Sequence, residues 1–368
     1  MEFLAIAVGL VLACANGAND NFKGVATLFG SGTTTYRRSL SWATLTTAAG
    51  SITALVMARG LLAAFSGKGL VPPELVADPR FPTAVALAAG TTVFLATRLG
   101  FPVSTTHALT GGLVGAALSA PCGEIDLGKL VNGFVLPLLS SPFVAILATL
   151  VLYPTLRYAR RRMGIEPETC LCVGDEGVAV VPGMAQAAPV VSASMTPILG
   201  VGTTTTCRVR YAGQVLGISA RPVLDAAHYL SAGMVGFARG LNDTPKIAAL
   251  LLGGQILAPN TGIVSVALAM GVGGWLGARR VAETMSKRIT ALNPGQGFTA
   301  NAVTSLLVVG ASSLGLPVST THVSCGALFG IGAVSGRARG KVIGEILLAW
   351  MLTLPIAALL GALAMRVA

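Results

Sequence analysis

Long apolar stretches follow one another along the whole chain and are separated by short polar segments. Most of them are close to the ~20 residues that a helix needs to cross a lipid bilayer. The pattern predicts an all-α polytopic membrane protein with about 10–12 helical segments. The apolar stretches lie at residues 2–30, 39–65, 81–99, 101–120 and 130–156, and again at 224–257, 260–278, 298–315, 317–336 and 342–366.

A hydrophilic segment, residues 157–222, separates the two groups of apolar stretches. It opens with a basic run that includes Arg157 and Arg160–Arg162, and it continues with β-prone runs such as CLCVGDEGVAVV. We therefore expect a first membrane half at 1–156, a small insert with β-strands at 157–222 and a second membrane half at 223–368.

Composition supports a membrane protein and argues against nucleic-acid binding. Of the 368 residues, 53% are hydrophobic and 11% are charged, whereas soluble domains carry about 25% charged residues. The net charge of +11 is explained by basic residues at the membrane edge, because cytoplasmic loops are enriched in Lys and Arg. The expected partner is the lipid bilayer, and no nucleic acid is expected.

Two motifs occur twice in the same order, which indicates an internal repeat. GANDNFKG (17–24) corresponds to GLNDTPKI (240–247), an offset of 240 − 17 = 223 residues. GFPVSTTH (100–107) corresponds to GLPVSTTH (315–322), an offset of 315 − 100 = 215 residues.

Basic clusters predict the topology of the two halves. They lie at 37–38, 157–162, 279–288 and 337–341, and all become cytoplasmic if the N-terminus is outside and each apolar stretch crosses once. The first half then crosses five times, so the second half is inverted, both termini lie outside and the insert is cytoplasmic. Inverted repeats build many secondary transporters, with the substrate site where the repeats meet. A re-entrant course of the VSTTH segments is the alternative that would change the number of crossings.

Asp20 and Asp243 are carboxylates within apolar stretches at equivalent repeat positions. A charged side chain in the bilayer costs about 3 kcal/mol or more and is usually functional. Lys23 and Lys246 follow three residues later on the same helix face, so each pair can meet and is nearly neutral. We therefore predict that the two Asp motifs form a paired substrate-binding site; a buried carboxylate that caps a broken helix is the alternative. The motifs also supply the amides of Asn19 and Asn242, and the glycines that we expect to open the helices, namely Gly17, Gly24 and Gly240.

The two VSTTH motifs supply hydroxyl groups and imidazoles. Pro102 and Pro317 precede them, so Ser104 and Ser319 are expected to be N-caps of new helices. A helix N-terminus offers free N–H groups and partial positive charge, which suits an oxyanion. The alternative is that the hydroxyls bond back to their own helix. The predicted anion-binding hydroxyls are those of Ser104, Thr105, Thr106, Ser319, Thr320 and Thr321; for His107 and His322, a structural hydrogen bond and a proton relay are both open.

These motifs resemble the inorganic phosphate transporter (PiT) family, which includes related sulfate permeases. GARRVAETMSKRITALNPGQGF (277–298) and the terminal AWMLTLPIAALLGAL are also similar to its second half. The resemblance implies symport of phosphate with Na⁺ or H⁺ across the cell (plasma or inner) membrane, an inverted-repeat fold, often a homodimer, and an anion between the two Asp motifs and the hydroxyls. Sulfate is the alternative substrate, and an anion channel is a further one.

The chain departs from the family pattern at two positions of the Asp motifs. The family commonly has Asn three residues after each Asp, where this chain has Lys23 and Lys246. A fixed ammonium group there either replaces a bound sodium ion or contacts the anion, which puts sodium coupling in doubt and makes proton coupling equally plausible.

The sequence argues against an enzyme and against a resident cofactor or metal. An intramembrane hydrolase needs one asymmetric pair of nucleophile and base, whereas here Ser and His are duplicated. The sequence contains no G-x-x-x-x-G-K-[ST] motif for nucleotide binding, which argues against transport driven directly by ATP hydrolysis. In the insert, Cys170, Cys172 and Cys207 would face a reducing cytoplasm and are expected to be free thiols, because C-x-C with one distant Cys is a weak metal signal.

Overall fold

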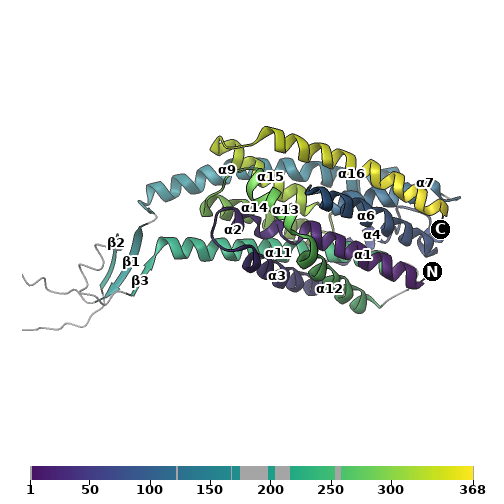
Figure 1. Cartoon of the computed structure of the whole chain (residues 1–368), viewed down its shortest axis with the longest axis horizontal. Helices are drawn as coiled ribbons and strands as arrows, with labels where there is room; N and C mark the ends of the chain where they lie inside the picture. Colours follow the sequence, from purple (N-terminus) through teal and green to yellow (C-terminus); the bar gives the residue numbers. More distant parts are fainter. Residues whose placement is uncertain are drawn as a thin grey trace, which may run out of the picture. The chain divides into compact units, whose positions relative to one another are not determined.

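The computed structural model describes residues 2–121, 123–166, 168–174, 198–203, 216–252 and 258–367 (Figure 1). The chain divides into two compact units, of which unit 1 comprises residues 1–153 and 228–368, and unit 2 comprises residues 154–227. Unit 1 is helical and contains all the motifs of the repeat.

The helices that lie wholly or partly in unit 1 follow the apolar stretches that the sequence predicts. In the first half they are α1 (Glu2–Asp20), the 3₁₀ turn η1 (Lys23–Val25), α2 (Ala26–Gly30), α3 (Tyr36–Met57), α4 (Arg59–Phe65), α5 (Pro73–Ala77), α6 (Arg80–Leu99), α7 (Thr105–Ser119), α8 (Leu127–Leu130), the π turn η2 (Val131–Val135) and α9 (Leu136–Arg162). In the second half they are α11 (Ala220–Leu252), α12 (Pro259–Gly277), α13 (Arg279–Glu283), the π turn η4 (Thr284–Arg288), α14 (Pro294–Ser313), α15 (Thr320–Ser335) and α16 (Gly340–Val367).

Among the described residues, six helical stretches are long and apolar enough to cross a membrane. They lie at 3–30, 36–57, 80–99, 127–162, 260–277 and 340–367. Large apolar side chains such as Leu147 and Leu268 are exposed on these helices, as expected for surfaces that contact lipid. The predicted class, a helical membrane protein with many spans, is confirmed.

The two Asp motifs differ in their effect on the helix. In the first, α1 ends at Asp20 and η1 intervenes before α2. In the second, α11 continues through GLNDTPKI, although it contains Pro245. The expected opening at Gly240 is therefore wrong. Gly240 instead lies so close to the Thr47 carbonyl of α3 that a Cβ atom would overlap it.

Each half of the chain packs its motif helices against helices of the other half. In α7, Gly111 and Gly115 lie against the backbone of α16 at Leu354 and Ala358. The equivalent glycines of α15, Gly326 and Gly330, lie against the α9 backbone at 142 and 146. Contacts through small residues bring helix backbones together in membrane proteins. The two halves are thus interlocked rather than stacked side by side.

This interlocking predicts that Gly115→Ala is destabilising. A Cβ atom there would overlap the Ala358 carbonyl, and overpacking of this kind costs about 1–3 kcal/mol. We expect a clearly lower midpoint of thermal unfolding in detergent. Gly310→Ala is the matched control, because no described atom lies within 4 Å of a Cβ at that position. Equal midpoints for the two variants would contradict the close packing of α7 on α16.

Unit 2 contains a three-stranded antiparallel sheet in its described part. The strands β1 (Thr169–Gly174), β2 (Ile198–Thr203) and β3 (Leu216–Ser219) lie in the order β2–β1–β3. The β-strands expected in the insert are therefore present. The helices α9 and α11 extend a few residues into the predicted insert from its two sides. Cys207 and the side chain of Cys172 lie outside the described residues.

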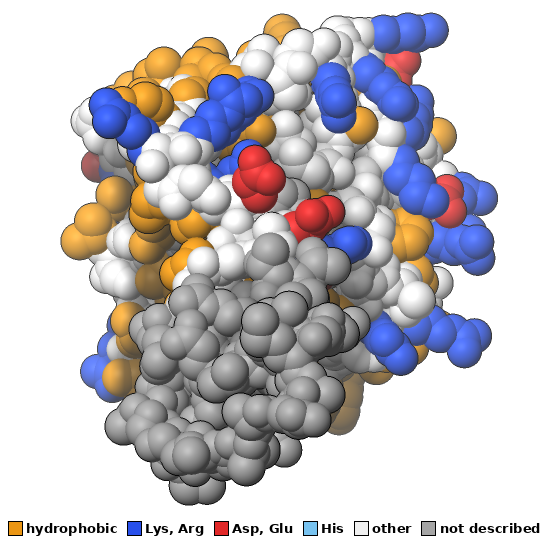
Figure 2. All heavy atoms as spheres, turned by 90° about the vertical axis from the view of Figure 1, so that its left-hand side faces the viewer, with side chains coloured by type: hydrophobic (Ala, Val, Ile, Leu, Met, Phe, Trp, Pro, Cys, Tyr) orange, Lys and Arg blue, Asp and Glu red, His pale blue; other side chains and the backbone are white. Residues whose placement is uncertain are grey.

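Several Lys and Arg side chains are exposed on the face of the molecule that Figure 2 shows. In unit 1, the clusters at 279–288 and 337–341 are neighbours, because Arg339 donates a hydrogen bond to the Lys287 carbonyl at 3.1 Å. Arg288 also pairs with Glu345 at 3.5 Å. Two of the basic clusters that the sequence places on one side of the membrane are thus joined in the structure.

Candidate functional site

The VSTTH motifs form the N-termini of α7 and α15. Ser104 accepts a hydrogen bond from the backbone N–H of His107 at 3.0 Å, and Ser319 accepts one from that of His322 at 3.2 Å. Both predicted N-caps are confirmed. The threonine hydroxyls consequently lie in the first turn of each helix, where backbone N–H groups are free of helical partners.

The two helix N-termini meet each other inside unit 1. Thr106 donates to the Val318 carbonyl at 3.2 Å, and the equivalent Thr321 donates to the Val103 carbonyl at 2.8 Å. The second threonine of each motif therefore bonds to the other motif and not back to its own helix. This exchange places the two VSTTH segments in one compact arrangement.

Asp20 lies at this junction and is 1% exposed. Its carboxylate forms an ion pair with Lys23 and accepts hydrogen bonds from Asn16 at 2.8 Å and from Thr105 at 3.0 Å. The carboxylate thus links α1, η1 and α7, and the predicted contact between Asp20 and Lys23 is confirmed.

Asp243 lies beside Asp20 and is 2% exposed. It pairs with Lys246 at 3.8 Å, as the sequence predicts, and with Arg239 at 3.7 Å. Thr320 lies 3.4 Å from its Oδ2 atom. The Asn16 amide is 2.8 Å from one carboxylate and 3.4 Å from the other, so it joins the two Asp motifs.

The side-chain amides of Asn19 and Asn242 donate hydrogen bonds to residues that precede α7 and α15 in the chain. Asn19 donates to Thr97 at 2.9 Å and to the Phe101 carbonyl at 3.0 Å. Asn242 donates to the Val318 carbonyl at 3.2 Å and to its neighbour Asp243 at 2.9 Å. These hydrogen bonds connect both residues to the VSTTH segments.

Asn16 and Arg239 are members of this cluster that sequence reasoning missed. The repeat offset of 239 − 16 = 223 makes them equivalent positions. They also touch, because the Arg239 guanidinium donates to the Asn16 amide oxygen at 2.6 Å. Arg239 lies within an apolar stretch and is 1% exposed. It precedes Asp243 by four residues, a spacing that places both on one helix face, and this spacing could have identified Arg239 as a site residue.

The cluster carries a net positive charge among the described residues. With every group in its ordinary ionised form, three cations, Lys23, Arg239 and Lys246, face two carboxylates, which leaves one formal positive charge. Buried charges are tolerated when they are paired and hydrogen-bonded. An additional small anion would balance the remaining charge.

The two motif histidines lie next to each other behind the hydroxyls. Their ring centroids are 4.4 Å apart, and the His322 ring lies at a tilt beside that of Trp350, with 3.9 Å between the centroids. Within the described residues, the Nδ1 atom of His107 and the Nε2 atom of His322 lack hydrogen-bond partners. This geometry is compatible with either role that the sequence leaves open.

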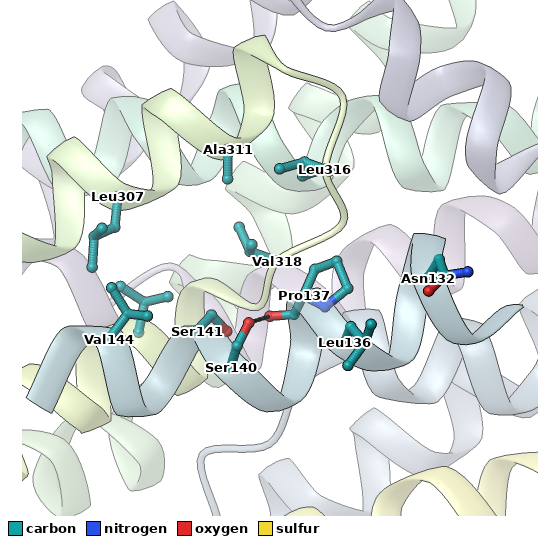
Figure 3. A pocket seen from close by; sticks show the side chains of 11 residues that line it. Asn132, Leu136, Pro137, Ser140, Ser141, Val144, Leu307, Ala311, Leu316 and Val318 are labelled. Atoms are coloured by element: carbon teal, nitrogen blue, oxygen red, sulfur yellow. Dashed lines mark hydrogen bonds between the residues drawn. The ribbon is translucent and has the colours of Figure 1, made fainter. Parts of the chain in front are cut away.

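A cavity of about 330 Å³ lies between α9 and the segment from α14 to α15 and reaches Val318 (Figure 3). Its walls are largely apolar, with side chains such as Leu136, Val144 and Leu307. The hydroxyls of Ser140 and Ser141 bond to carbonyls of α9 at 3.4 and 3.3 Å. Such a lining does not suit a phosphate ion, so the charged cluster is the better candidate site.

The fold and the buried, duplicated charge cluster define a polytopic membrane transporter. The sequence model of the phosphate transporter family matches residues 16–361. The chain belongs to this family, as the motifs predict, and it is not an enzyme.

Similar proteins cover almost the whole chain. A Pyrococcus abyssi protein, assigned as a phosphate permease by inference, is 28% identical over 99% of this chain and 97% of its own. The "Probable low-affinity inorganic phosphate transporter" of Rhizobium meliloti is 27% identical over 97% of this chain and 93% of its own. A solved structure, "The sodium-dependent phosphate transporter", has a TM-score of 0.75 at 21% identity and covers 100% of this chain and 98% of that chain. This last likeness shows the fold.

Proposed function

We propose that this protein is a secondary transporter that moves inorganic phosphate across the cell membrane by symport with H⁺ or Na⁺. We propose that the phosphate binds where the two Asp motifs meet the two VSTTH motifs. The observation that carries this proposal is the convergence of all four motifs into one buried cluster with one net positive charge. Family membership supports phosphate as the substrate.

The chemistry of the cluster favours phosphate over sulfate. Hydrogen phosphate carries a proton and can donate a hydrogen bond to a carboxylate, whereas sulfate at neutral pH only accepts. Asp20 and Asp243 provide such acceptors. The hydroxyls of Thr105 and Thr320 donate to these carboxylates in the structure and are expected to turn toward a bound anion. Sulfate is the second candidate, since Lys23 pairs with Asp20 and reduces the carboxylate's capacity to accept from the substrate.

The helix lengths support inverted repeats with re-entrant VSTTH helices. The helices α7 and α15 have 15 and 16 residues, fewer than the ~20 needed to cross a bilayer. Because their N-termini meet, each helix is expected to begin near the midplane, and the two helices are expected to run toward opposite sides of the membrane. The two termini of the chain lie at the same end of unit 1 (Figure 1), which fits both termini on one side of the membrane. That this side is the outside, and that the insert is cytoplasmic, stay predictions. A homodimer remains a prediction.

Uptake into liposomes tests the proposed function. Purified protein reconstituted with an inward H⁺ or Na⁺ gradient is expected to accumulate labelled phosphate, and unlabelled phosphate is expected to compete much better than sulfate. Phosphate flux that never exceeds its own equilibrium distribution would indicate a channel, and stronger competition by sulfate would indicate a sulfate permease.

The hydroxyls beside the carboxylates provide a site-specific prediction. Replacing both Thr105 and Thr320 by Val keeps their shape and removes two donors, at ~1 kcal/mol for each neutral hydrogen bond. We expect the half-saturation concentration for phosphate to rise tenfold or more. Thr92→Val is the matched control, because the one hydrogen bond of this buried hydroxyl within the described residues goes to the Ala88 carbonyl of its own helix, at 2.8 Å. An unchanged half-saturation concentration in the double variant would exclude these hydroxyls from the site.

A further inference from the structure

We infer, building on the phosphate transport proposed above, that the ammonium groups of Lys23 and Lys246 permanently fill two cation sites beside the anion site. Phosphate uptake by this protein is therefore independent of sodium. The proton is then the coupling ion among the two proposed.

The surroundings of the Lys23 ammonium group are those of a small cation. Within the described residues, its hydrogen-bond partners are all oxygens, of four chemical types: a carboxylate, an amide, a backbone carbonyl and a hydroxyl. Oxygen ligands of these types are the ones that hard cations take in proteins. The partners are Asp20, Asn19 Oδ1 at 2.8 Å, the Val103 carbonyl at 2.9 Å and Thr321 Oγ1 at 2.5 Å.

The local backbone fits the same interpretation. The helix α1 ends at Asp20, and Lys23 lies in the turn η1 that follows. Its ammonium group contacts the last two residues of α1, Asn19 and Asp20. Val103 lies in the non-helical segment before α7. Unwound carbonyls and the C-terminal ends of broken helices coordinate cations in many transporters, and here an ammonium group lies at that position.

Lys246 occupies the equivalent place in the second repeat. Its ammonium group lies 2.7 Å from the Val318 carbonyl, 2.8 Å from Thr106 Oγ1 and 3.8 Å from Asp243. The offset of 215 residues relates Val318 to Val103 and Thr321 to Thr106. Both lysines thus use the carbonyl of one VSTTH segment and the second threonine of the other. A structural salt bridge alone does not require this repeated set of oxygens.

Burial makes the occupation permanent. The side chains of Lys23 and Lys246 are 2% and 1% exposed, and each ammonium is covalently tethered within its site. A sodium ion would have to displace an ammonium group from the oxygens it needs, against the repulsion of like charges. The fold is shared with the solved structure "The sodium-dependent phosphate transporter", but in this chain the two ammonium groups contact the oxygens described above.

Wild-type protein provides the first test. Initial phosphate uptake into liposomes is measured in sodium chloride and in choline chloride at the same pH gradient, and equal rates within twofold are expected. A tenfold or greater loss of uptake in choline would overturn the inference while leaving phosphate transport intact. Absence of phosphate uptake in both media would instead count against the proposed function.

Sodium binding to purified protein tests the cation sites without transport. The midpoint of thermal unfolding in detergent is expected to be the same in sodium chloride and in choline chloride of equal ionic strength. A stabilisation of the wild type by sodium alone would overturn the inference.

Removing the tethered cations is expected to create sodium dependence. Lys23→Asn with Lys246→Asn leaves the oxygens without their cation, and sodium is expected to raise the unfolding midpoint and to stimulate uptake at least fivefold. Lys129→Asn is the matched control, because its exposed ammonium bonds to one carbonyl, that of Lys68 at 2.9 Å. If the double variant does not fold, Lys23→Asn alone is measured in the same way. A folded variant without any response to sodium would contradict the inference.

Discussion

Asp20→Asn is expected to reduce phosphate uptake to less than a tenth of the wild-type rate, and Asp243→Asn is expected to do the same. Asparagine has nearly the shape of aspartate and still accepts from Asn16 and Thr105, so insertion into the membrane should persist. What is lost is the charge that pairs with Lys23. Breaking one partner of a buried ion pair costs about 3–5 kcal/mol. The cluster then carries two net positive charges, which hold the anion and oppose its release.

A surface carboxylate provides the control for this prediction. Asp78 accepts hydrogen bonds from the Arg80 guanidinium, which lowers the pKa of this carboxyl group and keeps it ionised at neutral pH. Asp78→Asn removes the same charge at a site far more exposed than Asp20, and uptake should stay near normal. Both measurements use initial phosphate uptake into liposomes at equal protein content. Near-normal uptake by Asp20→Asn would remove this carboxylate from the mechanism.

The parts of the site that sequence could predict are local ones. Ser104 and Ser319 cap their helices because a serine before a helix bonds to the third N–H group on. Asp20 and Lys23 meet because three residues of helix bring two side chains to one face. These outcomes depend on a few neighbouring residues, so motif spacing was sufficient to predict them.

The contacts between the two halves could be identified only from the structure. The meeting of Thr106 with Val318, and of Thr321 with Val103, depends on helices that exchange partners across the repeat. The same long-range packing keeps α11 continuous past Gly240, where composition suggested an opening. A glycine indicates either flexibility or close approach, and sequence alone does not separate the two.

One pair of site residues could not be identified from the similarity of the two repeats. A search for matching residues passes over Asn16 and Arg239, since an amide and a guanidinium at equivalent positions look unrelated. In the structure they bond to each other and join the two Asp motifs. Equivalent positions that differ in charge are therefore as informative as identical ones where two repeats share a site.

Arg239→Met is expected to raise the half-saturation concentration for phosphate at least tenfold. The guanidinium donates to Asn16 at 2.6 Å and to Asn21 at 3.0 Å, and it lies 3.7 Å from Asp243. Methionine fills much of the space but removes the third cation, so the net charge of the cluster falls to zero and the attraction for an anion is lost. Arg239→Lys retains the charge without the planar fork of donors, and it should recover part of the affinity.

Matched measurements separate a role in anion binding from a role in packing. Arg279 forms an ion pair with Glu283 at the same four-residue spacing, but its side chain is 82% exposed. Surface pairs of this kind contribute little to stability, so Arg279→Met should leave both phosphate affinity and the unfolding midpoint unchanged. For Arg239→Met, phosphate affinity and the unfolding midpoint are both measured on purified protein. A lower midpoint with unchanged affinity would assign Arg239 to packing alone. A loss of affinity that Arg239→Lys partly restores would place its charge at the phosphate, because the lysine variant lacks the fork that joins the two repeats.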